Sequence, residues 1–231
     1  YPPTTPELAD ARGKRIGILI VAYNAATTLA KVFRRIPEIV WQNVEEVVVF
    51  DDASQDETFE LALGYLHVNP NAKLKVFKNE KNQGYGGNQI LGYRYFMDKG
   101  FDIVVLLHGD GQYAPEILAH MYHPLVTGQA EAVFGSRMMK DFGGPLKGGM
   151  PLYKYVGNKI LTWCENRLLR TRLSEFHSGY RIYSVAALKK VPRLGDKTFE
   201  QAAGFLRVMD GDREIDLKPH ARDEVARLTV E

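Results

Sequence analysis

Residues 103–112 read IVVLLHGDGQ, an apolar run followed at once by polar side chains and glycines. The aliphatic part, Ile103 to Leu107, predicts a strand that is buried on both faces. His108, Asp110 and Gln112 follow at intervals of two, and alternate side chains of an extended chain point the same way. An imidazole, a carboxylate and an amide are therefore expected to converge just beyond the end of a central strand.

Such a group of side chains suits a divalent cation, because Mg²⁺ takes few protein ligands and keeps substrate phosphate oxygens. Gly109 and Gly111 would let the backbone approach a ligand closely. The alternative is a polar turn in which Asp110 caps a helix that begins near Ala114. These residues alone leave both interpretations open.

Composition places the chain among ordinary globular proteins. Its 231 residues suffice for one sizeable α/β domain or two small ones, and 45% of them are hydrophobic. The net charge of +2 is too small to indicate nucleic acid as a partner. A lone cysteine, Cys164, excludes an internal disulfide. With no signal peptide and no apolar run of about 20 residues, we expect a cytoplasmic protein, with peripheral contact to the inner face of the membrane as an option.

Strand and helix patterns alternate along the chain. Strands are predicted at Ile16–Val21, Val44–Phe50, Leu74–Phe77, Ile103–Leu107 and Ala130–Phe134. Helices are predicted at Ala25–Ile36, from a Ser54 or Asp56 cap to about His67, from residues 82–88 to near Gly100, and from Pro115. This alternation predicts an α/β fold with a Rossmann-like, mostly parallel sheet and helices on both faces. Residues 1–13 are expected to form an extended tail, residues 14–190 one domain, and residues 191–231 an atypical C-terminal segment.

Polar residues stand where the predicted strands end. Tyr23 and Asn24 follow the first strand, Asp51 and Asp52 follow the second, and Arg137 follows the fifth. Ligands of parallel sheets bind beyond the carboxyl ends of the strands. An aromatic ring for a base, carboxylates for ribose hydroxyls and cations for phosphates together suit a nucleotide diphosphate.

The ordered motifs of the chain resemble those of family 2 glycosyltransferases. They are VAYN (21–24), VFDDASQDET (49–58), NQG (82–84), HGDGQ (108–112) and GSR (135–137), spread over roughly residues 14–190. The later SGYRIY segment (178–183) is similar to a motif of the polyprenyl-phosphate glycosyltransferases within that family. The resemblance implies the GT-A fold and inverting sugar transfer from a nucleotide-diphosphate sugar to a dolichyl or undecaprenyl phosphate, in pathways such as cell wall biosynthesis.

The resemblance also implies roles for individual residues. Residues expected to contact the donor nucleoside are Tyr23, Asn24, Asp51 and Asp52. Asp110 and Gln112 are expected to hold Mg²⁺ or Mn²⁺ together with the diphosphate. His108 stands where the family usually has aspartate, and histidine also binds ions of this type, so His108 completes the predicted metal set.

The chemistry of the acceptor decides which further groups are needed. A sugar hydroxyl requires a general base, whereas a lipid phosphate is already anionic and requires cations. The chain after residue 112 supplies mainly cations: Arg137, Lys140, Lys147, Lys154, His177 and Arg181. Arg137 and Arg181 are predicted to clamp the acceptor phosphate, because a guanidinium binds phosphate bidentately. With Asp110 they form the predicted catalytic set.

Two other functions stay open at this point. One is transfer to a glycan hydroxyl in cell-wall or surface polysaccharide synthesis, with Asp141 or Glu175 as the base. The other is a catalytically inactive module that binds nucleotide sugars, suggested by His108 and by the unusual C-terminal segment.

Two segments outside these motifs have their own patterns. Tyr153–Leu173 predicts an amphipathic basic helix, which would lie on an anionic membrane or pack on the sheet. Pro192–Leu206 resembles a helix-hairpin-helix segment of the Tex transcription-accessory proteins, although residues 199–201 and 215–219 also align loosely with the end of the glycosyltransferase family. No catalytic role is assigned beyond Lys190.

Overall fold

The computed structural model describes residues 8, 10–69, 73–136, 138 and 150–190. The chain divides into two compact units. The larger contains the chain up to Val133 and again from Ile182, and the smaller is Phe134–Arg181. Among the described residues, no helix is both long enough and apolar enough to cross a bilayer.

A six-stranded sheet has the strand order β3-β2-β1-β4-β6-β5. Its strands are β1 (Ile16–Ala22), β2 (Glu46–Asp51), β3 (Leu74–Lys78), β4 (Ile103–His108), β5 (Ala132–Phe134) and β6 (Arg181–Ser184). β1 pairs in parallel with β2 and β4, and β2 pairs in parallel with β3. The Gly135 N–H donates to the Tyr180 carbonyl and the Ser184 N–H to the Glu131 carbonyl, so β5 and β6 run in opposite directions. The predicted mostly parallel sheet is confirmed.

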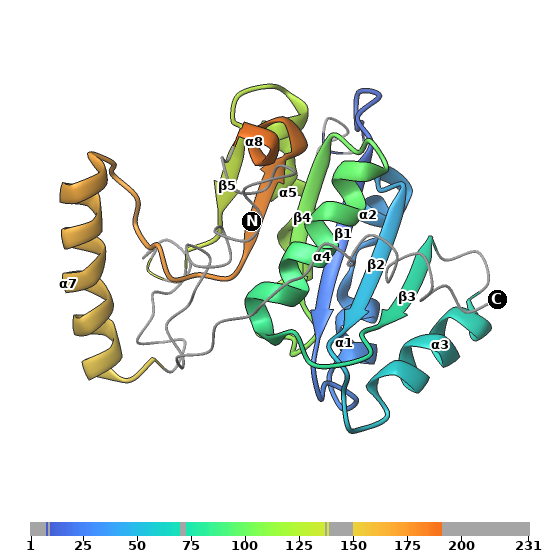
Figure 1. Cartoon of the computed structure of the whole chain (residues 1–231). Coiled ribbons are helices and arrows are strands. Elements are labelled where there is room, and N and C mark those ends of the chain that lie inside the picture. The colour runs from blue at the N-terminus through green and yellow to red at the C-terminus, as the bar shows by residue number, and fades with distance from the viewer. Residues whose placement is uncertain (1–7, 9, 70–72, 137, 139–149, 191–231) are drawn as a thin grey trace. The chain divides into compact units, whose positions relative to one another are not determined.

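Helices cover both faces of the parallel strands, which explains why β1 and β2 are buried at every position. They are α1 (Leu29–Arg35), α2 (Glu38–Asn43), α3 (Thr58–Val68), α4 (Gly84–Asp98), α5 (Leu118–Val126, after a 3₁₀ turn at Pro115–Ile117) and α8 (Val185–Lys190). Figure 1 shows α4 on one side of β1 and β2 and α2 on the other. α4 packs directly on β1, because a Cβ at Gly17 would lie 2.1 Å from Phe96 and one at Gly92 would lie 2.2 Å from Leu19.

Three helix predictions need correction. The helix predicted from Ala25 begins at Leu29, and the N–H groups of Ala25 and Ala26 donate to the side chains of Thr58 and Asp56. α2 was not predicted, since six residues after Pro37 are too few to show a helical period. The N-cap position of α3 is Glu57, but the Asp56 carboxylate still accepts from the first N–H of the helix, that of Thr58, at 3.1 Å.

The smaller unit contains α7 (Leu152–Leu169). The predicted helix continued to Leu173, but α7 ends at Leu169, and its C-cap residue Arg170 has a left-handed φ of 54°. Asn166 then fastens the returning chain, since its side chain both donates to the Leu173 carbonyl and accepts from the Leu173 N–H, each at 2.8 Å.

Candidate functional site

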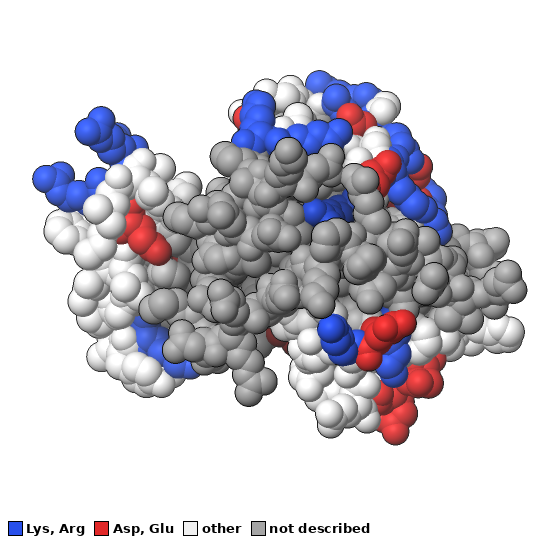
Figure 2. Space-filling model, in the orientation of Figure 1, with Lys and Arg blue, Asp and Glu red and all other residues white. Residues whose placement is uncertain are grey.

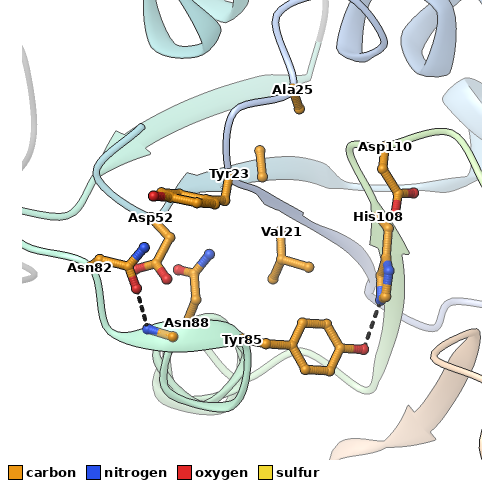
Figure 3. A pocket seen from close by; sticks show the side chains of 11 residues that line it. Val21, Tyr23, Ala25, Asp52, Asn82, Tyr85, Asn88, His108 and Asp110 are labelled. Carbon is orange, nitrogen blue, oxygen red and sulfur yellow. Dashed lines mark hydrogen bonds between the residues drawn. The ribbon is translucent and has the colours of Figure 1, made fainter. Parts of the chain in front are cut away.

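A pocket of about 420 Å³ lies at the carboxyl ends of β1, β2 and β4 (Figure 3). Such a position is where parallel sheets bind their ligands. The residues that line it are Val21, Ala22, Tyr23, Ala25, Asp52, Asn82, Gly84, Tyr85, Asn88, His108 and Asp110.

The pocket brings together part of the predicted site. Tyr23, Asp52, His108 and Asp110 all line it. Three further predicted residues are not among its lining residues: Asn24, Asp51 and Gln112. Arg137 lies outside the described residues, and Arg181 belongs to the smaller unit.

Asp52 is a buried carboxylate that lines this pocket, with only 3% of its surface exposed. Its Oδ1 accepts hydrogen bonds from the Gln83 N–H at 2.7 Å and from Asn79 Nδ2 at 2.8 Å. Asn79 also donates to Asn88 Oδ1 at 3.1 Å, so residues beyond β3 and on α4 fix the carboxylate. Burial raises the pKa of Asp52 above its ordinary value of 3.8, although these hydrogen bonds act in the opposite direction.

The raised pKa of Asp52 predicts a specific pH dependence of stability. The folded protein keeps a proton on Asp52 that the unfolded chain releases, so stability falls as pH rises from about 3.8 through the raised pKa. Asp52→Asn keeps the Oδ1 acceptor but removes the charge. The variant should therefore gain unfolding free energy relative to wild type across this window, by about 1.4 kcal/mol for each pH unit by which the pKa is raised. Urea unfolding between pH 4 and 7.5 measures it.

A matched control for that experiment is the exposed carboxylate of Asp98, at the end of α4. Asp98→Asn should leave the pH dependence of the unfolding free energy unchanged. If the stability difference between wild type and Asp52→Asn is constant with pH, Asp52 does not carry the raised pKa.

Asp51 and Asn24 fasten two loops to each other. Asp51 is fully buried, and its carboxylate accepts from the N–H and the hydroxyl of Ser54. The Asn24 N–H donates to Ser54 Oγ, and Asn24 Oδ1 accepts from the Gln55 N–H, both at 2.9 Å. Asn24 and Ala53 have positive φ angles of 48° and 56°, a conformation that persists where surrounding contacts fix it. Nucleoside contact by Asp51 and Asn24 stays a prediction; the contacts described here shape the loops beside Tyr23.

The extended arrangement predicted for His108, Asp110 and Gln112 is wrong. β4 ends at His108 and the chain then turns, with Gly111 at a φ of +74°. Asp110 Oδ1 accepts from the Gln112 N–H at 3.0 Å, which makes a local turn and does not cap the helix near Ala114. Gln112 is exposed, and the group that it donates to Asp110 is its backbone N–H, not its side-chain amide. His108 and Asp110 are therefore the members of the predicted metal set that reach the pocket.

His108 is held by two tyrosines. Its Nε2 lies 2.9 Å from the Tyr85 hydroxyl, an interaction drawn in Figure 3. The Tyr85 and Tyr113 rings meet the imidazole edge to face, with centroids 5.2 and 4.8 Å away. The orientation of the imidazole is thus set by α4 and by the turn after β4.

The donor set at this turn fits a cation that the substrate helps to bind. Within the described part of the chain, no group of three or more His, Cys, Asp and Glu side chains is arranged to hold a metal ion. If a cation binds here, His108 and Asp110 would supply one nitrogen and one carboxylate, and substrate phosphate oxygens and waters would complete the coordination. A carboxylate suits Mg²⁺ and Mn²⁺ alike, whereas an imidazole suits the transition metal better.

Sequence reasoning missed Tyr85, Asn79 and Asn88. Tyr85 is in the first turn of α4, and Asn88 donates to the Phe50 carbonyl at 2.9 Å from one turn further on. The signal was the Asn- and Gly-rich segment at residues 82–88, which follows the third strand just as the other polar clusters follow theirs.

Arg181 is anchored within the smaller unit. Its Nε donates to the Ser178 carbonyl and its Nη2 to the Phe176 carbonyl, both at 3.0 Å. Its guanidinium carbon lies 5.8 Å from the centroid of the Phe134 ring. The Phe176–Arg181 segment is therefore folded around this guanidinium.

The family model for Glycosyl transferase family 2 matches residues 17–191. The chain belongs to this family. It is 31% identical over 188 residues to UDP-N-acetylglucosamine–dolichyl-phosphate N-acetylglucosaminyltransferase of Methanococcus voltae, which covers 76% of the chain and 72% of the relative. It is 27% identical over 181 residues to undecaprenyl-phosphate mannosyltransferase of Micrococcus luteus, which covers 77% and 69%.

Solved structures of glycosyltransferases share the fold of this family 2 chain. A mannosyltransferase from Pyrobaculum calidifontis in complex with GDP-Man and Mn²⁺ has a TM-score of 0.55 at 19% identity, with 78% of this chain and 48% of that one covered. Glucosyl-3-phosphoglycerate synthase from Mycobacterium tuberculosis with Mn²⁺, UDP-glucose and phosphoglyceric acid has a TM-score of 0.60 at 21% identity, covering 83% and 65%. The expected GT-A fold is confirmed, and the chain spans about half to two thirds of these structures.

A short second similarity involves another class of protein. Over 46 residues the family 2 chain is 52% identical to Protein tex of Bordetella pertussis, which covers 19% of this chain and 6% of that protein. A resemblance to Tex proteins was noted for Pro192–Leu206, a stretch that lies outside the described residues.

Proposed function

We propose that this family 2 chain transfers a sugar, with inversion, from a nucleotide-diphosphate sugar to a polyprenyl phosphate. The observation that carries the proposal is the pocket in which Tyr23, Asp52, His108 and Asp110 meet at adjacent strand ends. Relatives named as dolichyl-phosphate and undecaprenyl-phosphate sugar transferases support the choice of acceptor.

Four of the lining residues have a proposed role in binding the donor. Tyr23, which is half exposed at the pocket, offers a ring on which the base stacks. Asp52 accepts a hydrogen bond from the base or the ribose, with Asn24 and Asp51 shaping the loops around it. His108 and Asp110 hold Mg²⁺ or Mn²⁺. When bound, the cation neutralises the charge of the leaving nucleotide diphosphate.

A lipid phosphate is favoured over a glycan hydroxyl as the acceptor, because it attacks without a general base. Glu175, one of the two carboxylates considered as a base, is 2% exposed and accepts from Asn158 Nδ2 at 3.2 Å. Asp141, the other, lies outside the described residues.

A polyprenyl phosphate resides in a bilayer, so the proposal includes peripheral contact with the inner face of the membrane. α7 supports it, because it combines Trp163 with Lys154, Lys159 and Arg167. Figure 2 shows the side chains of α7 largely uncharged on the visible face, with Lys or Arg near both ends of the helix. Basic groups beside aromatic and apolar ones are typical of helices that lie on anionic lipid.

Thermal-shift measurements with a panel of nucleoside diphosphates, each with and without Mn²⁺, identify the donor base. Transfer of radiolabelled sugar is then measured to a short polyprenyl phosphate in solution and to a long one in phosphatidylglycerol vesicles. We expect Mn²⁺-dependent stabilisation and transfer to both acceptors. Transfer only to glycan hydroxyls contradicts the acceptor, and nucleotide binding without transfer or donor hydrolysis supports an inactive binding module instead.

A further inference from the structure

Arg35, the last residue of α1, holds the turn that carries Asp110. Its Nη1 donates to the Gly111 carbonyl at 3.1 Å. Its Nε and Nη2 donate to the two carboxylate oxygens of Glu116, at 2.8 and 3.1 Å. The bidentate ion pair fixes the plane of the guanidinium, and the remaining arm therefore reaches one residue past Asp110 at a fixed angle.

The same helix holds the turn on the other side of Asp110. Thr28, the N-cap residue of α1, donates its hydroxyl to the Gly109 carbonyl at 2.8 Å, and the Ala25 carbonyl is slightly more distant at 3.1 Å. The Gly109 N–H in turn donates to the Val21 carbonyl at 2.9 Å. The backbone is thus fastened one residue before and one residue after Asp110.

The turn needs such support because both neighbours of Asp110 are glycines. Gly111 has a φ of +74°, which other residues rarely adopt. A Cβ at Gly109 would lie 3.1 Å from that of Ala22, tighter than ordinary contact. Glycine makes this shape accessible but loses more conformational freedom on ordering than any other residue. Without external contacts, Asp110 would therefore sample many positions.

We propose that Arg35 is a positioning residue of the site, which places the Asp110 carboxylate for the cation and diphosphate before they bind. This inference rests on the proposed function. Arg35 is not among the residues that line the pocket, so it acts through the Gly111 carbonyl and not by touching the ligand. A group ordered in advance binds more tightly, because less freedom is lost on binding.

The direction in which cation affinity changes when Arg35 is replaced separates a positioning role from a purely electrostatic one. Removing Arg35 deletes a positive charge near the cation and leaves Glu116 without its bidentate partner. Coulomb's law alone then predicts tighter cation binding. Positioning predicts weaker binding, because the turn is released.

A matched control stands at the opposite end of the sheet. Arg15 makes a bidentate pair with Glu45, at 2.7 Å for both bonds, and donates to the carbonyls of Lys99 and Gly100 at 2.7 and 3.1 Å. It precedes β1, whereas the pocket lies beyond the carboxyl end of that strand. Arg15→Ala therefore removes the same kind of clamp far from the site.

The experiment compares Arg35→Ala with Arg15→Ala in the full chain. Calorimetry measures Mn²⁺ affinity in the presence of UDP and, separately, GDP. Hydrogen exchange of the peptide 107–112 is followed without ligand. We expect Arg35→Ala to weaken Mn²⁺ affinity about tenfold, as for removal of other groups that orient metal ligands, and to speed exchange of this peptide. Arg15→Ala should lower the melting temperature without either change, and Arg35→Lys should recover only part of the affinity.

Unchanged or tighter Mn²⁺ binding by Arg35→Ala overturns the inference, even if exchange becomes faster, because the clamp would then be structural only. A wild type that binds neither nucleotide nor Mn²⁺ overturns the proposed function as well, so the two failures are distinguishable. Arg35→Gln serves if Arg35→Ala does not fold. It removes the same positive charge and the bidentate fork but keeps part of the side chain, and it should also weaken Mn²⁺ affinity, whereas Coulomb's law alone predicts tighter binding.

Discussion

Asp110→Asn is expected to lower the turnover of sugar transfer about 10³-fold, with the melting temperature nearly unchanged. Asp110 is exposed, and its Oδ1 accepts from the Gln112 N–H. Asparagine keeps that acceptor, so the turn should survive while the negative charge that attracts the cation is lost. Asp110→Ala removes both, and should add about 1 kcal/mol of destabilisation. Transfer rate, Mn²⁺ affinity and thermal melting are measured for each variant.

Gln112→Ala is the informative comparison for this experiment. The amide of Gln112 was predicted to join the metal site, yet its side chain is not among those that line the pocket. We therefore expect Gln112→Ala to lower the transfer rate and the Mn²⁺ affinity much less than Asp110→Asn does. Equal losses would restore Gln112 to the metal set, and nucleotide and Mn²⁺ binding by Asp110→Asn as tight as in wild type would remove Asp110 from it.

The sheet was predictable because its parallel strands are covered on both sides. β1 and β4 are uninterrupted apolar runs, and their predicted bounds differ from the observed ones by a single residue, Ala22 and His108. Once the strands are known, the carboxyl ends of β1, β2 and β4 locate the pocket without further information. α2 escaped prediction because six residues carry too little periodic signal.

Individual site residues were harder to assign because their orientation depends on single dihedral angles. Asp51 and Asp52 are adjacent, but successive residues at a strand end point in opposite directions, so only Asp52 lines the pocket. Gly111 reverses the chain after His108, which removes Gln112 from the predicted cluster. Tyr85 reaches His108 because α4 begins at Gly84, which has a positive φ of 73°. None of these turns is specified by the apolar pattern.

The acceptor prediction concerns Arg181 in the smaller unit and Arg137, which lies outside the described residues. Arg181→Ala is expected to lower transfer to polyprenyl phosphate on the order of 10²-fold while donor affinity changes little, because a guanidinium clamp acts on the acceptor. Arg181→Lys keeps the charge but loses the fork, so rescue should be partial. Transfer of radiolabelled sugar and donor affinity are measured separately for each variant.

Arg181→Ala removes a positive charge and also two structural hydrogen bonds, because Nε and Nη2 donate to the carbonyls of Ser178 and Phe176. The experiment must distinguish the consequences of these two losses. Thermal melting reports how far the loss of these bonds loosens the segment. Arg172→Ala removes an exposed positive charge from the same unit and should leave transfer unchanged.

Suppose instead that Arg137→Ala and Arg181→Ala both lose donor affinity and keep acceptor affinity. The arginines would then neutralise the donor diphosphate, and the acceptor would no longer be supplied with its cations. A hydroxyl acceptor with a carboxylate base would become the better explanation, and Asp141 and Glu175 the residues to replace next.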